Sequence, residues 1–393
     1  MMKRSKVGAA LALVASVLCW SNASQAEVGV TPTSIRIGMV APLTSSFAFG
    51  SLALLGAEAV YKDVNDSGGV NGRKIELSVV DDACDPNQAI ADTKRLISQD
   101  QVFMIHGGWC SGNVMAMKPE LAANPTLPFM DLGAASASIS TPTQPNIFQP
   151  VATTMTVSQA MVDFALSKTG AKRVAIISTS DDWGRSHLNP ILADLKAKGL
   201  TPVENVTMDR GDTDATSQVL RIKAAKPDFV LAVLYAPELT IYVRSGFRYG
   251  LNAPIVTTEG VSIEDMVKRV GNPAATKQLF VFYPLSQPLN APGFRKWVDM
   301  YRKYNPGQPV ETISFMGMTG ALAIVEALKH AGPDLTREKF IAQLNNLKGF
   351  DPGVQSGPLT FSATQHAGIN SGKMIYWANG DPKIVASYPG QSQ

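Results

Sequence analysis

Short apolar runs alternate with longer amphipathic segments along almost the whole chain of 393 residues. In the first part of the chain, apolar runs at 35–40, 74–80 and 102–105 predict strands, and the segments 52–64 and 86–98 predict helices between them. Strands joined through a helix pair in parallel, and the helices then cover both faces of the sheet. The alternation therefore predicts an α/β fold built on parallel sheets.

A second series of the same kind begins after the Pro- and Thr-rich stretch 141–154. Strands are expected at 173–178, 202–208, 229–235 and 255–258, and helices at 155–168, 183–198, 213–225, 238–249 and 263–270. Two such series predict two doubly wound, Rossmann-like lobes.

The rest of the chain is too short for a third domain and is expected to complete these lobes. It contains two long helical segments, 292–304 and 312–331, and a hairpin at 372–388 that turns at Asn379-Gly380-Asp381. A chain that returns to an earlier lobe crosses between the lobes several times, and such a hinge suits closure around a ligand. The predicted first lobe is 27–149 with 283–358, and the predicted second lobe is 150–282 with 359–393.

The first 26 residues have the pattern of a signal peptide. A basic start precedes the apolar run 7–20, and Ser24-Gln25-Ala26 has the small-x-small form of a cleavage site. The run is shorter than the about twenty residues that span a bilayer. Cys19 follows Leu18, where a lipoprotein signal wants a small residue. We therefore predict an exported, periplasmic protein cleaved after Ala26.

Removal of this leader leaves a chain without net charge, since its three basic residues account for the excess of 35 Lys and Arg over 32 Asp and Glu. A neutral chain has neither the basic footprint of a nucleic-acid-binding protein nor a polybasic membrane patch. The sequence also has no contiguous apolar stripe that indicates an oligomer. We expect a monomer with no nucleic-acid partner.

Two cysteines, Cys84 and Cys110, remain after the leader. In an exported chain such a pair most simply forms one disulfide. A metal pair and a reactive thiol are the alternatives, but no histidine or further cysteine stands near them at ligand spacing. We favour the disulfide.

The usual catalytic patterns are missing from the sequence. The histidines are far apart and none forms a metal-binding pair on a helix: His106, His187, His330 and His366. No nucleophile elbow or dinucleotide-binding glycine motif occurs, and the acidic segment 81–85 lacks the spacing of a calcium loop. The sequence therefore predicts a protein that is not an enzyme and holds no metal or cofactor.

Small and hydroxyl residues gather instead at two expected strand-to-helix bends. The segment 107–113 contains Ser111, and the segment 133–138 contains Ser136. Backbone N–H groups at the start of a helix are unpaired and bind anions such as a carboxylate. An equally weighted alternative for Ser111 is a helix N-cap beside a disulfide.

Several motifs, taken in order, resemble those of leucine/isoleucine/valine-binding periplasmic proteins. They are Gly69-Val70-Asn71-Gly72-Arg73, Asp81-Asp82-Ala83-Cys84-Asp85-Pro86, Cys110-Ser111, Ala134-Ala135-Ser136, Tyr235-Ala236-Pro237-Glu238 and Thr258-Glu259-Gly260-Val261. The resemblance covers nearly the whole chain after the leader. It implies a type I periplasmic binding protein, in which two α/β lobes joined by three crossings close on a small molecule and deliver it to an ABC transporter in the membrane. It also implies a disulfide between the two cysteines.

The resemblance also implies a set of ligand-binding residues. Ser111 is expected to bind a carboxylate, and Ala134, Ala135 and Ser136 to contact the carboxylate and ammonium of the ligand. Glu259 is expected to hold the ammonium from the opposite lobe.

Aromatic residues mark the departures from the family's amino-acid binders. Phe49 and Trp183 stand where tyrosines are common, and Ser136 replaces a threonine. Trp109 adds bulk beside the carboxylate site, and Tyr235 falls where the family places an aromatic contact. Flat aromatic walls suit a ring as well as a branched alkyl chain.

We therefore predict a substrate-binding protein for an amino acid with an apolar, branched-chain side chain. An aromatic carboxylate or another amine-free organic acid is the alternative ligand. It would require Glu259 to turn away or be protonated, because a buried carboxylate without a cationic partner is costly. A secreted hydrolase is disfavoured, because Ser111 and Ser136 have no histidine base near them in the sequence. A membrane sensor that reads the closed lobes fits the same pattern as a permease.

Overall fold

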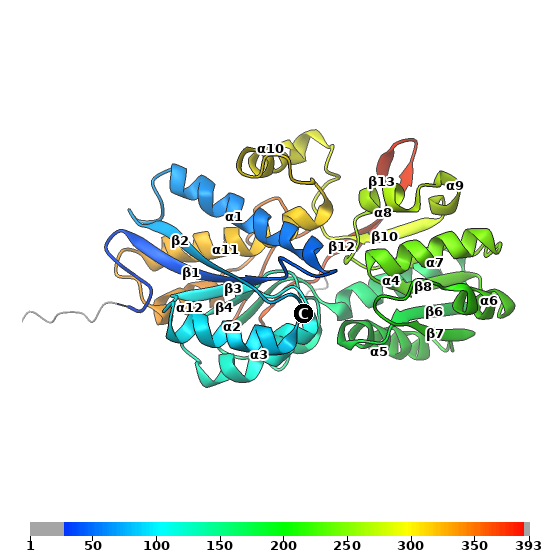
Figure 1. Cartoon of the computed structure of the whole chain (residues 1–393), viewed down its shortest axis with the longest axis horizontal. Coiled ribbons are helices and arrows are strands. Elements are labelled where there is room, and N and C mark those ends of the chain that lie inside the picture. The colour runs from blue at the N-terminus through cyan, green and yellow to red at the C-terminus, as the bar shows by residue number, and fades with distance from the viewer. Residues whose placement is uncertain (1–26, 389–393) are drawn as a thin grey trace, which may run out of the picture.

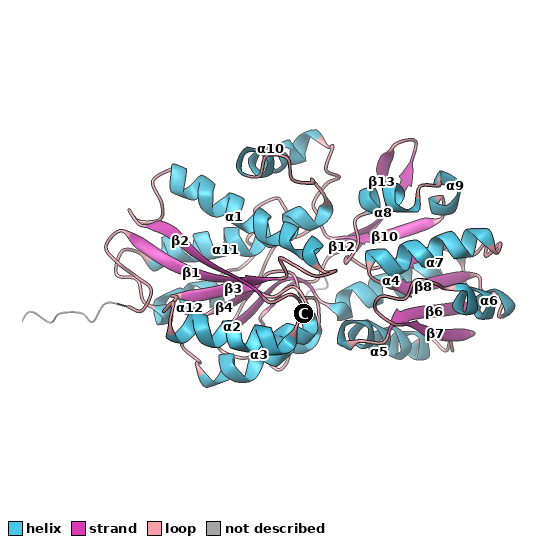
Figure 2. Cartoon of the chain, in the orientation of Figure 1, coloured by secondary structure: helices cyan, strands magenta, loops and turns pink. Residues whose placement is uncertain are grey.

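The computed structural model describes residues 27–388, apart from the side chains at 168 and 169. The chain forms two lobes that lie side by side, each built on one sheet (Figure 1). The predicted signal peptide and its cleavage site lie outside the described residues. Helices flank the strands in both lobes, as an α/β fold requires (Figure 2).

The first lobe contains a six-stranded sheet in the order β11-β5-β4-β3-β1-β2, and all of its pairs are parallel. Helices α2 and α3 pack together, as do α1, α11 and α12. The strands are β1 Ser34–Ala41, β2 Lys74–Asp81, β3 Met104–Gly107, β4 Phe129–Asp131, β5 Ile147–Ala152 and β11 Ala367–Ile369. The helices are α1 Ser51–Asp66, α2 Pro86–Ser98, α3 Ser111–Ala123, α10 Arg295–Tyr304, α11 Met316–Ala331 and α12 Arg337–Asn345.

The second lobe contains a seven-stranded sheet in the order β13-β12-β10-β9-β8-β6-β7. Its pairs are parallel from β7 to β10, and the hairpin β12–β13 adds an antiparallel edge. The strands are β6 Val174–Thr179, β7 Glu204–Met208, β8 Phe229–Val233, β9 Ile255–Thr257, β10 Leu279–Tyr283, β12 Gly372–Ala378 and β13 Asp381–Tyr388. The helices are α4 Thr154–Thr169, α5 Asp182–Ala197, α6 Thr216–Ala224, α7 Ala236–Arg248, α8 Ile263–Val270 and α9 Pro273–Thr276.

Four short 3₁₀ turns complete the described elements. They are η1 Ala48–Gly50, η2 Ala137–Ile139, η3 Pro292–Phe294 and η4 Thr312–Phe315. The predicted helix 312–331 is thus the turn η4 followed by α11. This segment is long and apolar enough to resemble a membrane span, but it is mostly buried within the protein. Its apolar composition is therefore accounted for by its place in the core of the first lobe.

The described chain passes between the two sheets three times, after β5, β10 and β11. The expected tail of the second lobe, 359–393, is in fact divided. Its strand β11 pairs with β5 in the first sheet, and only the hairpin from Gly372 joins the second. Strand β11 has only three residues, which is too short for an alternation of apolar and polar residues to be recognised. The sequence pattern therefore did not predict this strand. Strand β5 also runs past the predicted boundary at 149; the remaining boundaries stay predictions.

Candidate functional site

A small pocket lies between the two lobes. Its lining residues follow the carboxyl ends of strands β3, β4, β6, β8 and β9, or begin helix α11. In α/β sheets this is the edge where ligands bind. The first lobe contributes Trp109, Cys110, Ser111, Gly133, Ala135 and Met316, and the second contributes Trp183, Tyr235, Glu259 and Gly260.

Six of the nine predicted ligand-binding residues line this pocket: Trp109, Ser111, Ala135, Trp183, Tyr235 and Glu259. The other three, Phe49, Ala134 and Ser136, are not among the lining residues. The structure thus brings most of the predicted set together, and their contact with a ligand stays a prediction.

Ser111 is buried at the first position of helix α3. Its Oγ accepts a hydrogen bond from the Ser136 amide at 3.3 Å, so its own hydroxyl hydrogen is left to donate into the pocket. The first hydrogen bonds of the helix run from the amides of Asn113 and Val114 to the Cys110 carbonyl. The amides before them face the helix end, whose positive partial charge favours a carboxylate.

Ala134 and Ser136 support this end of the pocket from behind. The Gln149 side chain donates from Nε2 to the carbonyls of both residues, at 2.8 and 3.1 Å. The Ala134 amide donates to Asp131 Oδ1 at 3.2 Å. These bonds fix the backbone on either side of Ala135, which does face the pocket.

Trp109 forms the apolar wall beside Ser111, and its position depends on two glycines. A Cβ atom on Gly133 would lie 2.6 Å from Trp109 Cζ3, and one on Gly50 would lie 2.6 Å from its Cδ1. The Phe49 ring packs edge-on against Trp109, with centroids 6.0 Å apart. Phe49 therefore holds the tryptophan in place behind the pocket wall.

The wall in the second lobe is a stacked pair of rings. Trp183 lies 4.3 Å from Tyr235 between ring centroids, at an interplanar angle of 23°. Tyr235 Oη donates to Asp181 Oδ2 at 2.9 Å, and burial and the Asp181 carboxylate raise the pKa of Tyr235 well above its usual value. The tyrosine hydroxyl is thus neutral, and its hydrogen is used by Asp181. Phe47 packs edge-on against the Tyr235 ring at 5.1 Å from the opposite lobe.

Glu259 closes the polar end of the second lobe and is 3% exposed. Its Oε1 lies 3.5 Å from Nε2 of His187, a fully buried residue of helix α5. Its Oε2 has no hydrogen-bond partner in the part of the chain that the structure describes. A buried carboxylate oxygen in that state is ready to accept a donor from a ligand.

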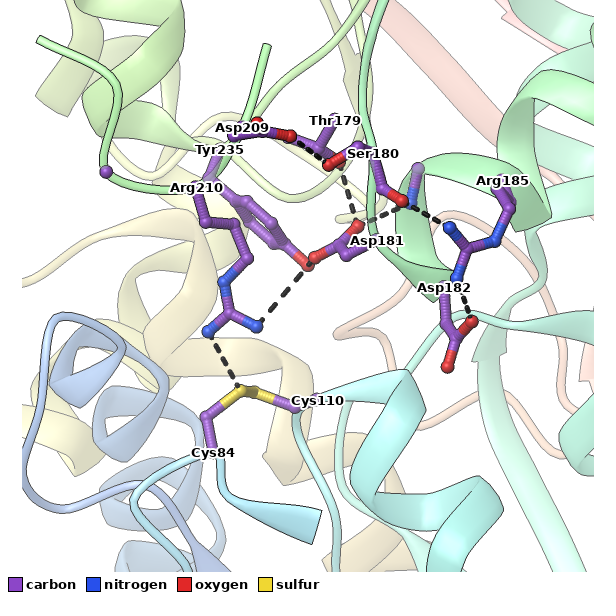
Figure 3. Close-up of polar contacts among 12 residues, drawn as sticks. Cys84, Cys110, Thr179, Ser180, Asp181, Asp182, Arg185, Asp209, Arg210 and Tyr235 are labelled. Carbon is purple, nitrogen blue, oxygen red and sulfur yellow. Dashed lines mark hydrogen bonds and ion pairs between the residues drawn. A yellow bond between two sulfur atoms is a disulfide. The ribbon is translucent and has the colours of Figure 1, made fainter. Parts of the chain in front are cut away.

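Cys84 and Cys110 form the expected disulfide, with their Cα atoms 5.8 Å apart. The disulfide fixes Cys110, the residue before Ser111, to the loop after β2. Arg210 reaches it from the other lobe (Figure 3): its Nη2 donates to Cys84 Sγ at 3.6 Å. The same guanidinium lies 3.7 Å above the Phe47 ring and 3.9 Å from Asp181 Oδ2. This contact between the lobes lies next to the pocket-lining Tyr235, whose ring is 5.9 Å from the guanidinium.

The sequence did not indicate the roles of four residues around the site: Phe47, His187, Arg210 and Met316. Each lies outside the matched motifs, and each reaches the site only through the folding of the chain. His187 follows Trp183 by one helical turn, and that spacing was a usable signal that both face the same way. Within residues 27–388 no cluster of three His, Cys, Asp or Glu residues suits a metal ion.

Comparisons with known proteins agree with this geometry. A family model described as periplasmic binding protein matches residues 34–381. The Leu/Ile/Val-binding protein homolog 7 of Brucella abortus is 28% identical over 382 residues, covering 92% of this chain and 94% of that protein.

Two solved structures share the fold. The branched-chain amino acid transporter substrate binding protein LivJ from Streptococcus pneumoniae, in complex with isoleucine, has a TM-score of 0.77 at 20% identity, covering 91% of this chain and 99% of that one. An ABC transporter solute binding protein from R. palustris, in complex with benzoate, has a TM-score of 0.79 at 19% identity, covering 92% and 98%. With the two lobes and the match over 34–381, these findings show that the chain belongs to the periplasmic binding protein family, type I.

Proposed function

We propose that this protein is the periplasmic substrate-binding component of an ABC importer and that it closes on an amino acid with an apolar, branched-chain side chain. The observation that carries the proposal is the polarity of the pocket. Ser111 and the start of α3 offer donors at one end, and the unpaired oxygen of Glu259 offers an acceptor at the other. The zwitterion of an amino acid matches this polarity, with its carboxylate at the donor end and its ammonium at the acceptor end.

The lining between the two ends suits an apolar side chain. Trp109, Trp183 and Met316 contribute flat or flexible apolar surface, as small-molecule sites commonly do. An exported location, with cleavage after Ala26, and a membrane permease as partner complete the proposal. They rest on the sequence pattern of the leader and on the family.

An amine-free acid is the second candidate ligand, and the position of His187 beside Glu259 supports it. Because His187 lies at ion-pair distance from Glu259, the carboxylate does not depend on a ligand ammonium for a partner. The benzoate complex of the R. palustris protein shows that the fold accommodates such an acid in another member. Benzoate and 3-phenylpropanoate represent this class in the test below.

The test is a thermal-shift screen of residues 27–393 against all amino acids and a set of aliphatic and aromatic acids. A ligand at 100 times its Kd adds about 2.7 kcal/mol of stability, which such a screen detects. A rise in melting temperature with leucine, isoleucine or valine that is lost in Glu259→Gln supports an amino acid as the ligand. Shifts with amine-free acids alone would replace it by the second candidate, and no shift with either class would overturn the proposed function.

A further inference from the structure

The Glu259–His187 pair differs from an ordinary ion pair in its surroundings. Both side chains are buried, at 3% and 0% exposure, and Glu259 lines the pocket whereas His187 lies behind it. The 3.5 Å separation of Oε1 and Nε2 is within ion-pair range, yet Nε2 makes no hydrogen bond within residues 27–388. The charge of the pocket wall therefore depends on the protons that this pair holds.

Ser158 of helix α4 fixes one of those protons. Its hydroxyl lies 3.1 Å from the His187 carbonyl and 3.2 Å from His187 Nδ1. A carbonyl can only accept, so the single hydroxyl hydrogen of Ser158 is used there. With that hydrogen assigned to the carbonyl, Ser158 Oγ accepts from Nδ1, which in this assignment carries a hydrogen. A neutral imidazole with a hydrogen on Nδ1 has a bare lone pair on Nε2.

A lone pair on Nε2 facing an ionised Glu259 is repulsive, and one proton between them removes the repulsion. We propose that the pair holds this proton when the pocket is empty or contains an amine-free acid, and that an amino acid expels it to solvent when its ammonium reaches Glu259. His187 is in this account a specificity-determining residue that acts through Glu259. The inference rests on the proposed function, because it concerns the same ligand site.

Other charged groups near the pair are engaged elsewhere. On α5 itself, Arg185 pairs with Asp182, and Lys198, just beyond the helix end, pairs with Asp194 and with Asp163 of α4. From the loop before α5, Asp181 accepts the Tyr235 hydroxyl and caps the helix at Gly184.

The remaining elements near α5 bring no closer charge to the pair. From the β8–α7 segment, Glu238 accepts the Gly211 amide, and from the loop after β7, Arg210 contacts Asp181 and Phe47. Helix α3 faces α5 through Gly112, whose added Cβ would meet Asp182 at 3.6 Å. Within residues 27–388, Glu259 is thus the charged partner at ion-pair distance from His187.

The proposal predicts opposite pH trends for two ligands that differ in one group. Leucine must displace the proton, so its affinity rises with pH, by up to about tenfold per unit for one proton. The matched acid 4-methylpentanoate has the same carbon chain without the amine and needs the proton to remain, so its affinity falls over the same range. The comparison is made from pH 6 to 8, where the carboxylates of both free ligands stay ionised.

Titration calorimetry of the wild-type chain tests this directly. Measurements in two buffers of different ionisation enthalpy count the protons exchanged on binding. We expect release with leucine, and retention or uptake with 4-methylpentanoate. No proton exchange with leucine, or trends of the same sign for both ligands, would overturn the proposal.

Two variants test whether the pH trends depend on His187. His187→Gln removes the imidazole that shares the proton with Glu259, and both trends flatten. Ser158→Ala keeps the ring but frees Nδ1, so Nε2 takes the hydrogen without a net charge and proton release falls. His330→Gln removes an exposed histidine that pairs with Glu326, and it leaves the trends unchanged. Trends retained in both His187→Gln and Ser158→Ala would contradict the role of His187.

These outcomes are separable from a failure of the proposed function. If neither ligand class binds wild-type protein at any pH, the function itself is wrong. If a ligand binds with an affinity that does not change between pH 6 and 8, the function stands and the proton-holding pair is rejected.

Discussion

Gly133 and Gly260 act at the scale of single residues by leaving room for the two tryptophans of the pocket. A Cβ on Gly133 would lie 2.6 Å from Trp109, and one on Gly260 would lie 3.1 Å from Trp183. Indole rings are rigid and cannot yield as a flexible side chain does. The shape of the pocket is thus set by the absence of side chains as much as by their presence.

Replacement of Gly133 by alanine is expected to push Trp109 into the pocket. Overpacking of this kind costs about 1–3 kcal/mol, and here we expect it to appear as weaker ligand binding and a lower melting temperature. Titration calorimetry and thermal unfolding measure the two effects. Gly246→Ala in α7 is the matched control, since its Cβ would meet only the Leu251 side chain, at 3.8 Å. Equal affinities of Gly133→Ala and the wild type would contradict this account of Trp109.

The site residues differ in how far the sequence alone revealed them. Ser111, Ala135 and Glu259 belong to short motifs at the ends of expected strands, where the fold gathers its ligand contacts. His187 lies one helical turn after Trp183, and this spacing places the two residues on one face of the helix but does not show that His187 pairs with Glu259. Its partner Glu259 is 72 positions later in the chain, so only the folded structure joins them.

At the scale of elements, the loop after β7 is the feature that joins the lobes beside the pocket. Arg210 in this loop contacts the Phe47 ring and Cys84 of the first lobe. In the second lobe it lies near Asp181, which also caps α5 and holds Tyr235. A guanidinium over an aromatic ring contributes about 0.5–1 kcal/mol at a partly exposed site. We therefore expect the loop to favour the arrangement in which the two lobes are in contact.

Arg210→Gln is expected to weaken ligand binding by up to about fivefold, because closure loses this contact. Titration calorimetry with the best ligand from the screen measures the change. Arg221→Gln is the control, since Arg221 is exposed and pairs with Glu204 within the second lobe. An unchanged affinity in Arg210→Gln would show that the loop does not contribute to closure.

The raised pKa of Glu311, the residue before the turn η4, predicts that the stability of the protein depends on pH. The pKa of Glu311 is raised from 4.5 to about 7, mainly by burial and next by the nearby Asp265 carboxylate. A carboxyl with a raised pKa binds more protons in the folded than in the unfolded state between these values. Its contribution to stability is therefore present at low pH and is lost as the pH rises from about 4.5 to about 7.

Glu311→Gln is expected to make the melting temperature less dependent on pH between 5 and 8. The glutamine keeps an oxygen that can accept from the Ser314 amide, as Glu311 does in its capping box. Thermal unfolding at several pH values measures the effect, with Glu338→Gln, at an exposed position of α12, as control. An equal pH dependence in Glu311→Gln and the wild type would refute the assignment.

The elements themselves were mostly predictable, for reasons that individual cases make clear. Helix α2 begins at Pro86 after an Asp85 cap and has one buried face, so its bounds matched the prediction 86–98. Strand β5 was missed because it lies in a Pro- and Thr-rich stretch, and α12 and the three-residue β11 gave weak periodic signals. Long-range pairing, not local preference, selects these elements.

At the scale of the whole molecule, the three crossings between the sheets place two half-sites opposite each other. The donors of Ser111 and α3 belong to one lobe, and the acceptor Glu259 and the stacked rings belong to the other. Because residues of both lobes line the pocket, we expect the full binding energy only when both lobes contact the ligand. A hinge of short segments between rigid lobes allows this closure.

Titration of the best ligand from the screen into wild-type protein and Ser111→Ala tests the central claim most directly. The account predicts one site per chain in the wild type. It also predicts at least about tenfold weaker binding in Ser111→Ala, because a hydrogen bond to a carboxylate is worth about 1.5–3 kcal/mol. Equal affinity in the two proteins, or no binding of any apolar amino acid or acid, would contradict a ligand site between the lobes.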